Sequence, residues 1–242
     1  MKKAFVAALL IITAIPLLIG MAAMPRHGNS STPVHTHVSA RYLERGSDEA
    51  GSDNIVTGVL LNYRGLDTAG EVTVIFTALL AVLAVLIVRV KRPPDDTVTK
   101  HVSPRLPTPV SPIVDFVVRL MAPFIALFGI YVVAHGHVSP GGGFQGGAIL
   151  GGLFIVLSVV LGRARVMRMI PRSLVSWLQG AGVLSFVLIG IAGAVFTGSF
   201  LGFPAEQGQH LMREVMMLAL EAGIGVGGAA IFASIFLQME AE

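Results

Sequence analysis

The stretch VMMLALEAGIGVGGAAIFASIFLQ, residues 215–238, is the clearest indicator of the fold class of this chain. A membrane-spanning helix needs about 20 mostly apolar residues, and this stretch is longer and contains a single charged residue, Glu221. Five further apolar runs are long enough to span a membrane; they are residues 4–24, 71–88, 116–134, 143–162 and 174–197. We therefore predict an all-α, polytopic membrane protein with about six transmembrane helices.

The composition supports a membrane protein. Of the 242 residues, 54% are hydrophobic and 13% are charged, whereas a soluble domain has about 25% charged residues. The formal net charge is +3, but the basic residues flank apolar runs and form no nucleic-acid-binding cluster, so we expect no nucleic-acid partner. The chain has no Cys, which excludes disulfides, thiolate zinc sites and Cys-ligated iron–sulfur clusters. We expect no cofactor, and no catalytic motif such as GxSxG or HExxH occurs.

The first apolar run resembles a signal peptide, with Lys2 and Lys3 before it and Ala22 and Ala23 near its end. Its 21 uncharged residues exceed the apolar region of a signal peptide, about 7–15 residues, so we expect a retained first helix. If the N-terminus is inside, the inner segments carry eleven Lys and Arg residues and the outer segments five. This bias predicts N- and C-termini in the cytoplasm and a multi-pass location in the cell inner (plasma) membrane.

Two polar stretches divide the chain. Residues 25–70 are rich in Ser, His and Gly in their first part and predict a loose outer loop. Residues 93–112 are rich in proline, which excludes a continuous helix. We therefore predict a two-helix unit at residues 1–92, a Pro-rich linker at 93–112 and a four-helix domain at 113–242.

Glu221 interrupts the last apolar run. A carboxylate at the centre of a bilayer costs about 2.5–3.5 kcal/mol and normally faces a partner or a hydrated path. Gly223 and Gly227 expose the backbone beside it, so that a neighbouring helix can approach closely. Two interpretations stay open: a protonated Glu221 that only joins helices, or a group that handles protons or cations.

A second group of charged residues, Arg64, Asp67 and Glu71, precedes the second apolar run. In a helix, spacings of three and four place all three side chains on one face. Arg64 can then neutralise Asp67 and leave Glu71 at the mouth of the span. Gly65 and Gly70 each weaken a helix by about 1 kcal/mol, so a broken or re-entrant segment fits equally well. An interfacial ion pair and an ion path both remain open.

A third feature is HGHVSPGGGFQGGAILGG, residues 135–152. Gly143, Gly147 and Gly151 recur every four residues and predict a smooth stripe for helix packing. His135 and His137 are two residues apart, too close to share one helical face, and no third ligand lies nearby in the sequence. We therefore predict no metal site. Proton transfer by the imidazoles, whose pKa lies near 6.5, stays open.

Residues 111–152, SPIVDFVVRLMAPFIALFGIYVVAHGHVSPGGGFQGGAILGG, closely resemble the B subunit (MnhB-like) of Mrp-type multisubunit Na⁺/H⁺ antiporters. In that family a span ends in HGH and is followed by PGGGFQGG. The resemblance extends over residues 111–242. Residues 54–76, NIVTGVLLNYRGLDTAGEVTVIF, resemble the C-terminal tail of the antiporter A subunit, which is a separate small subunit in membrane-bound hydrogenases. The chain therefore resembles a fusion of the two.

The resemblance implies an accessory, structural and ion-path membrane subunit of a multisubunit Na⁺(cation)/H⁺ antiporter complex, and not an enzyme. The implied partners are the large antiporter-like A and D subunits, the small C, E, F and G subunits, membrane lipid, and Na⁺ and H⁺ as transported ions. An alternative stays open: the ion-translocating membrane module of an energy-converting membrane-bound hydrogenase or a related respiratory complex. By resemblance or by burial cost, the ion-path candidates are Glu71, Asp67, Glu221, Arg64, His135 and His137.

Overall fold

The structure is a computed structural model that describes residues 2–26, 28–32, 34–90, 110–204 and 209–239. The long helices are α1 (Lys2–Ala22), α4 (Gly65–Val90), α5 (Pro112–Ala134), α6 (Gly143–Leu161), α8 (Arg172–Thr197) and α9 (His210–Met239). The shorter ones are η1 (Val34–Val38), α2 (Ser39–Ala50), α3 (Ile55–Thr57), η2 (Gly58–Tyr63) and α7 (Arg163–Met169). The six long helices are each apolar enough to cross a membrane. The prediction of an all-α protein with six spans is confirmed.

The chain divides into two compact units, Met1–Glu44 and Arg45–Glu242. The first contains α1, whose described side chains are all exposed. The second contains the other five spanning helices and every residue discussed below. Most of the predicted Pro-rich linker falls within residues 91–109 and lies outside the described residues. The predicted division at residues 92 and 113 therefore stays a prediction.

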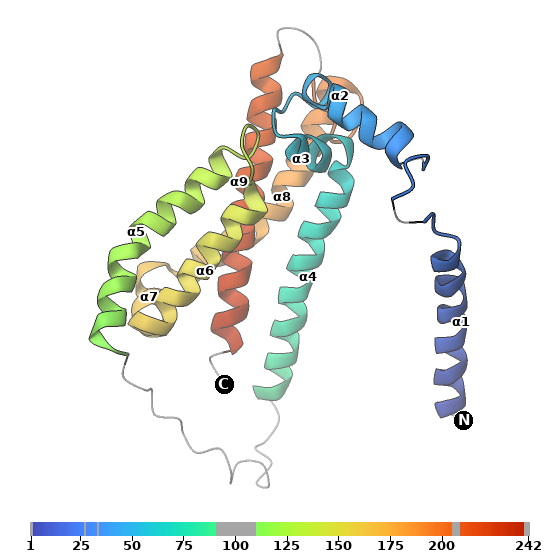
Figure 1. The fold of residues 1–242 in the computed structure, drawn as a ribbon. Coiled ribbons are helices and arrows are strands. Elements are labelled where there is room, and N and C mark those ends of the chain that lie inside the picture. The colour runs from blue at the N-terminus through green and yellow to red at the C-terminus, as the bar shows by residue number, and fades with distance from the viewer. Residues whose placement is uncertain (1, 27, 33, 91–109, 205–208, 240–242) are drawn as a thin grey trace. The chain divides into compact units, whose positions relative to one another are not determined.

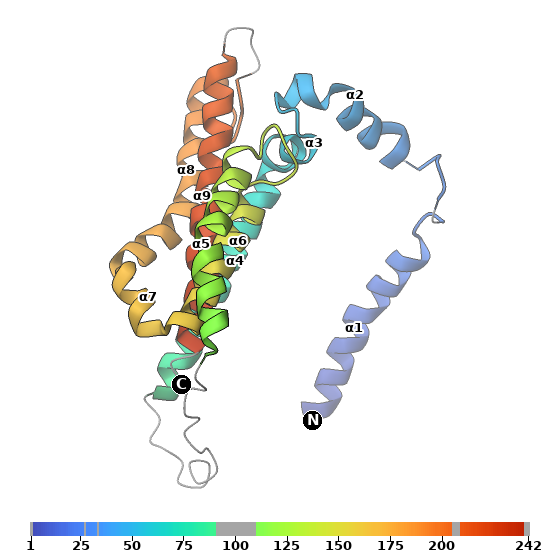
Figure 2. The same ribbon diagram turned by 60° about the vertical axis from the view of Figure 1, so that its left-hand side comes forward.

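Helix α9 is the central helix of the second unit. It packs against α6, α8 and α4, while α5 packs mainly against α6 (Figures 1 and 2). Where α9 meets α4 and α8, their apolar side chains form a core that includes Leu61, Val72, Phe186, Met217 and Leu220. Because this helix is covered on several sides, its polar residues are removed from lipid and must find partners within the protein.

Glycines allow α6 and α8 to approach α9 closely. A Cβ atom added to Gly147 would lie 2.7 Å from the Gly225 carbonyl oxygen, and one on Gly151 would lie 3.1 Å from Phe232 Cβ. On the other side of α9, a Cβ on Gly227 would lie 2.9 Å from Gly182 Cα of α8. Gly223 faces the Ser185 side chain in the same contact. Small residues at these positions let the helix backbones touch.

The prediction of a loose loop at residues 25–70 is wrong for its second half. Residues 39–63 are almost entirely helical, in α2, α3 and η2. The Asn54 side chain caps α3, because its Oδ1 accepts a hydrogen bond of 3.1 Å from the backbone N–H of Val56. Ser52, Thr57 and Leu61 are almost fully buried. Burial against the bundle therefore orders a segment whose polar composition predicts a loop.

The second span begins earlier than its apolar run. Helix α4 begins at Gly65, so Glu71 lies in its second turn and not at its mouth. Gly65 and Gly70 lie within regular helix, and the irregular backbone is confined to η2 and Arg64. Likewise α9 begins at His210, so it includes the turn before residue 215.

Candidate functional site

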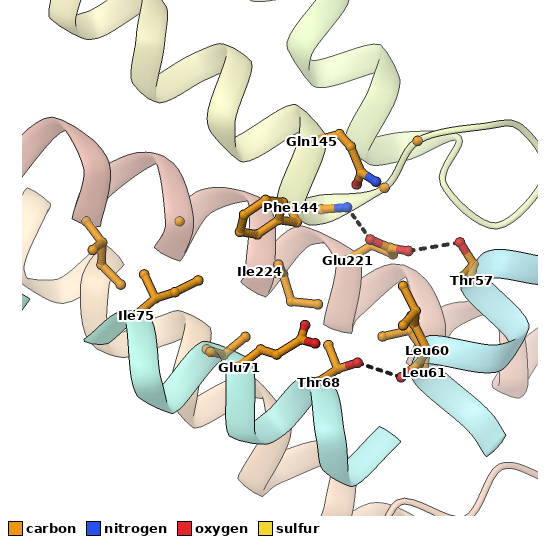
Figure 3. A pocket seen from close by; sticks show the side chains of 16 residues that line it. Thr57, Leu60, Leu61, Thr68, Glu71, Ile75, Phe144, Gln145, Glu221 and Ile224 are labelled. Carbon is orange, nitrogen blue, oxygen red and sulfur yellow. Dashed lines mark hydrogen bonds between the residues drawn. The ribbon is translucent and has the colours of Figure 1, made fainter. Parts of the chain in front are cut away.

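Glu221 is held by elements that come from both halves of the second unit. Its side chain on α9 is buried, with 5% of the residue exposed. Its Oε2 accepts a hydrogen bond from the backbone N–H of Gly143, the first residue of α6. The Thr57 Oγ1 lies 3.4 Å from Oε1 on the other side (Figure 3). The first backbone N–H groups of a helix have no intrahelical partner and carry a partial positive charge, so the α6 end suits a carboxylate.

The loop between α5 and α6 makes room for this carboxylate. A Cβ atom on Gly136 would lie 3.0 Å from Glu221 Oε1, and one on Gly142 would lie 2.9 Å from Oε2. Gly141 and Gly142 have φ angles of +140° and +144°, which side chains with a Cβ rarely adopt. The glycines of HGHVSPGGG therefore serve the position of Glu221 as well as the turn.

A segment of the N-terminal half binds the same loop. Asn54 Nδ2 donates hydrogen bonds of 2.8 Å to the carbonyl oxygens of Gly136 and Ser139. Ser52 Oγ donates one of 2.7 Å to the carbonyl of His137. Thr57 Oγ1 donates to the Gly136 carbonyl at 2.6 Å. These side chains join two parts of the chain that lie about 80 residues apart, and the sequence contains no motif that would have revealed the contact.

The hydrogen bonds of Thr57 accommodate both protonation states of Glu221. A threonine hydroxyl has one proton to donate and two lone pairs that accept. The short contact to Gly136 uses that proton, so Oγ1 can accept a proton from a neutral Glu221. A charged Glu221 keeps the hydrogen bond from Gly143. A carboxyl group with a partner in each state is suited to reversible proton binding.

Glu221 and Glu71 line one cavity of about 150 Å³. Glu71 lies on α4 and is exposed, and Figure 3 shows its carboxylate on the opposite side of Ile224 from Glu221. Between the two carboxylates the wall is largely apolar, with Thr57 and Thr68 as the hydroxyl groups. A cavity of this size with polar groups at its wall has room for water.

Asp67 and Arg64 do not line this cavity. The predicted ion pair between them is present, with Arg64 Nη2 2.5 Å from Asp67 Oδ2. The two side chains are 62% and 53% exposed, and exposed pairs of this kind contribute about 0–1 kcal/mol. The structure therefore separates Glu71 from the two residues with which the sequence grouped it.

The two histidines do not line the cavity either. His135 is exposed and stacks on Tyr131, with ring centroids 4.2 Å apart. His137 is half-buried, and its carbonyl holds Ser52. Among the described residues, no group of three or more His, Asp or Glu side chains could hold a metal ion.

Comparisons with known proteins identify the family. The model of a domain related to the MnhB subunit of Na⁺/H⁺ antiporter matches residues 113–238, which is more than half of the chain. The chain belongs to the MnhB family. A second family model, MbhE of the MBH complex, matches residues 8–105 of this MnhB-family chain.

Several relatives of the MnhB-family chain are subunits of membrane complexes. The B subunit of the Na⁺/H⁺ antiporter of Bacillus subtilis is 35% identical over 83 residues, which cover 34% of this chain and 57% of that protein. A chain of the membrane-bound sulfane sulfur reductase, an archaeal respiratory membrane complex, is 31% identical with a TM-score of 0.66. That alignment covers 99% of this chain and 98% of the other. A chain of the Mrp complex from Dietzia sp. is 27% identical with a TM-score of 0.62, and 97% of this chain aligns with 26% of it.

This MnhB-family chain is a multi-pass membrane protein. It spans less than two thirds of the length of the curated relatives that it matches. The two matched segments meet at the cavity, because Glu221 and the loop glycines belong to the MnhB-related segment while Thr57 and Glu71 belong to the MbhE-like segment. The cavity therefore exists only where both segments fold together.

Proposed function

We propose that this chain is an accessory, ion-path subunit of a multisubunit Na⁺(cation)/H⁺ antiporter complex in the plasma membrane. One observation carries the proposal: Glu221 and Glu71, from two separately recognised segments, line the same cavity. Glu221 is the group that binds and releases a proton. Glu71 is the second carboxylate of the path, on the exposed side of the cavity.

The environment of Glu221 supports a proton-carrying role. Burying a carboxylate within a membrane protein is costly, and such groups are retained mostly where ions pass. A residue that only joined helices would need one fixed hydrogen-bond pattern. Glu221 instead has a backbone N–H for its charged state and a hydroxyl acceptor for its neutral state, and it lies beside a cavity.

The chain is one subunit among several in this proposal. Lys occurs only at positions 2, 3, 91 and 100, so none lies within the predicted apolar spans. Lysines on broken helices belong to the antiporter-like subunits of the family that the sequence resembles, and this chain therefore needs them as partners. We propose the large A and D subunits and the small C, E, F and G subunits for that role.

The test is antiport activity of the assembled complex in inverted membrane vesicles. Glu221→Gln and Glu71→Gln should each reduce Na⁺-dependent dissipation of a pH gradient, because glutamine keeps the shape of glutamate and cannot ionise. Glu214→Gln is the matched control, because Glu214 lies on the same helix but is exposed. Assembly is checked by the subunits that co-purify. Full antiport in both test variants, with normal assembly, would show that the carboxylates only hold helices together.

A second candidate is the ion-translocating membrane module of a redox-driven complex. The observation that favours it is the full-length alignment with one chain of the sulfane sulfur reductase, in which both segments lie in a single chain, as they do here. Purification from native membranes in mild detergent, with metal analysis, separates the two candidates. Antiporter subunits without nickel or iron favour the first, and a redox partner with these metals favours the second. This chain has no Cys and would bind no cluster through thiolates in either complex.

A further inference from the structure

A second polar cavity lies toward the other end of the contact between α4 and α9. Its volume is about 140 Å³. Gln179 of α8 and Ser234 of α9 form its polar wall, joined by a hydrogen bond of 2.5 Å from Gln179 Nε2 to Ser234 Oγ. Arg163 and Leu83 also line it. Side-chain amides and hydroxyls in a membrane helix bundle normally face a partner or water, so this wall fits a hydrated space.

The two cavities follow the same pair of helices. On α4, Ile75 lines the first cavity and Leu83 the second. On α9, Ile231 lines the first and Ser234 the second. Leu79 lies on α4 one turn from both Ile75 and Leu83. Because a helix rises 1.5 Å per residue, Ile75 and Leu83 are about 12 Å apart along α4.

The region between the cavities is closed by apolar side chains. Leu79 is 1% exposed and Ile231 is 2% exposed, which places them among the most completely buried large side chains of the described chain. Leu79 lines neither cavity, and Ile231 lines only the one that contains Glu221. An apolar constriction of this kind interrupts a chain of water molecules, since water there would lose its hydrogen bonds.

We propose that the α4–α9 contact is a proton path made of two hydrated cavities, with Leu79 and Ile231 as a hydrophobic barrier between them. The inference rests on the proposed function, because Glu221 and Glu71 supply the protonatable groups of the first cavity. A proton crosses the barrier only when the two helices separate enough to admit water. The barrier thus prevents a continuous leak between the two sides of the membrane.

The second cavity favours protons over Na⁺. A hard cation prefers several oxygen ligands, with carboxylates among the strongest. The described lining of this cavity contains no carboxylate, and its charged member is Arg163, which repels a cation. Amides and hydroxyls instead hold water through hydrogen bonds, and a chain of water molecules conducts protons.

Cysteine accessibility in the intact complex tests the two-cavity arrangement. The chain has no native Cys, so Thr68→Cys, Leu79→Cys and Ser234→Cys each add one thiol to it. A membrane-impermeant methanethiosulfonate is applied to right-side-out and to inverted vesicles, and labelling of this chain is measured. Thr68→Cys and Ser234→Cys should react from opposite sides, and Leu79→Cys from neither. Labelling of Ser234→Cys from the Thr68 side, or from neither side, would overturn the proposal.

Proton leak through the reconstituted complex tests the barrier. Leu79→Ser should raise passive proton flux about tenfold, the change expected if the barrier falls by about 1.4 kcal/mol, while ²²Na⁺ flux stays unchanged. Leu80→Ser is the control, because Leu80 is the adjacent residue and is 49% exposed. Adding Glu221→Gln to Leu79→Ser should suppress the leak.

The two proposals fail in different ways. If Ser234→Cys and Thr68→Cys do not react from opposite sides while Glu221→Gln abolishes antiport, the proposed function stands and the α4–α9 path is wrong. If the leak of Leu79→Ser is equal to that of Leu80→Ser, the barrier is wrong. If antiport survives in both glutamate variants, the proposed function is wrong, whatever the labelling shows.

Discussion

Glu221 and Asp67 are both carboxylates near glycines in spanning helices, yet their surroundings differ. Asp67 is half-exposed and pairs with Arg64, three residues away. Glu221 is buried, and its partners Gly143 and Thr57 are 78 and 164 residues away in the sequence. A charge whose partner is local is thus stabilised by its own helix. A charge whose partners are distant depends on the assembled bundle, and it is the better candidate for an ion path.

The largest effect on this difference should come from closing the space around Glu221. In Gly143→Ala, the new Cβ would lie 2.8 Å from Ile224 Cβ and would meet the Glu221 backbone. Overpacking costs about 1–3 kcal/mol or more, so we expect a lower melting temperature in detergent and loss of antiport. Gly152→Ala is the control, because nothing lies within 4 Å of its added Cβ. Equal melting temperatures in the two variants would contradict the close α6–α9 contact.

A smaller effect should follow from removing one hydroxyl. Thr57→Val keeps the side-chain shape but loses the hydrogen bond to the Gly136 carbonyl and the contact with Glu221. One lost hydrogen bond costs about 1 kcal/mol, and a neutral Glu221 loses its acceptor. We expect a modest fall in melting temperature and a clear fall in antiport. Thr57→Ser should restore both properties, and a serine variant as inactive as the valine one would contradict the role of the hydroxyl.

The smallest effect should come from the exposed ion pair. Asp67→Asn and Arg64→Ala should each change stability by about 0–1 kcal/mol, because both side chains are more than half exposed. Antiport by the Asp67→Asn complex should match that of the parent within experimental error. A strong loss of antiport in Asp67→Asn would extend the ion path to this residue and remove the distinction between the two regions.

The six spans could be predicted from the sequence because length and hydrophobicity decide them locally. The Arg64–Asp67 pair was predictable for the same reason, since residues three apart on a helix are neighbours. The order in residues 39–63 was not, because polar residues predict a loop unless distant partners satisfy them. Ser52, Asn54 and Thr57 find those partners in the loop between α5 and α6.

The amino-acid sequence alone indicates an all-α membrane protein that resembles the MnhB family, and it marks Glu221 as an expensive residue to keep. These properties depend on composition, periodicity and motifs, which need no knowledge of neighbours. The packing of the helices is needed to show that Glu71 shares a cavity with Glu221 while Asp67, His135 and His137 do not. It also reveals the second cavity beyond Leu79. Cavities form where side chains of separate helices fail to fill space, and that depends on how the helices pack.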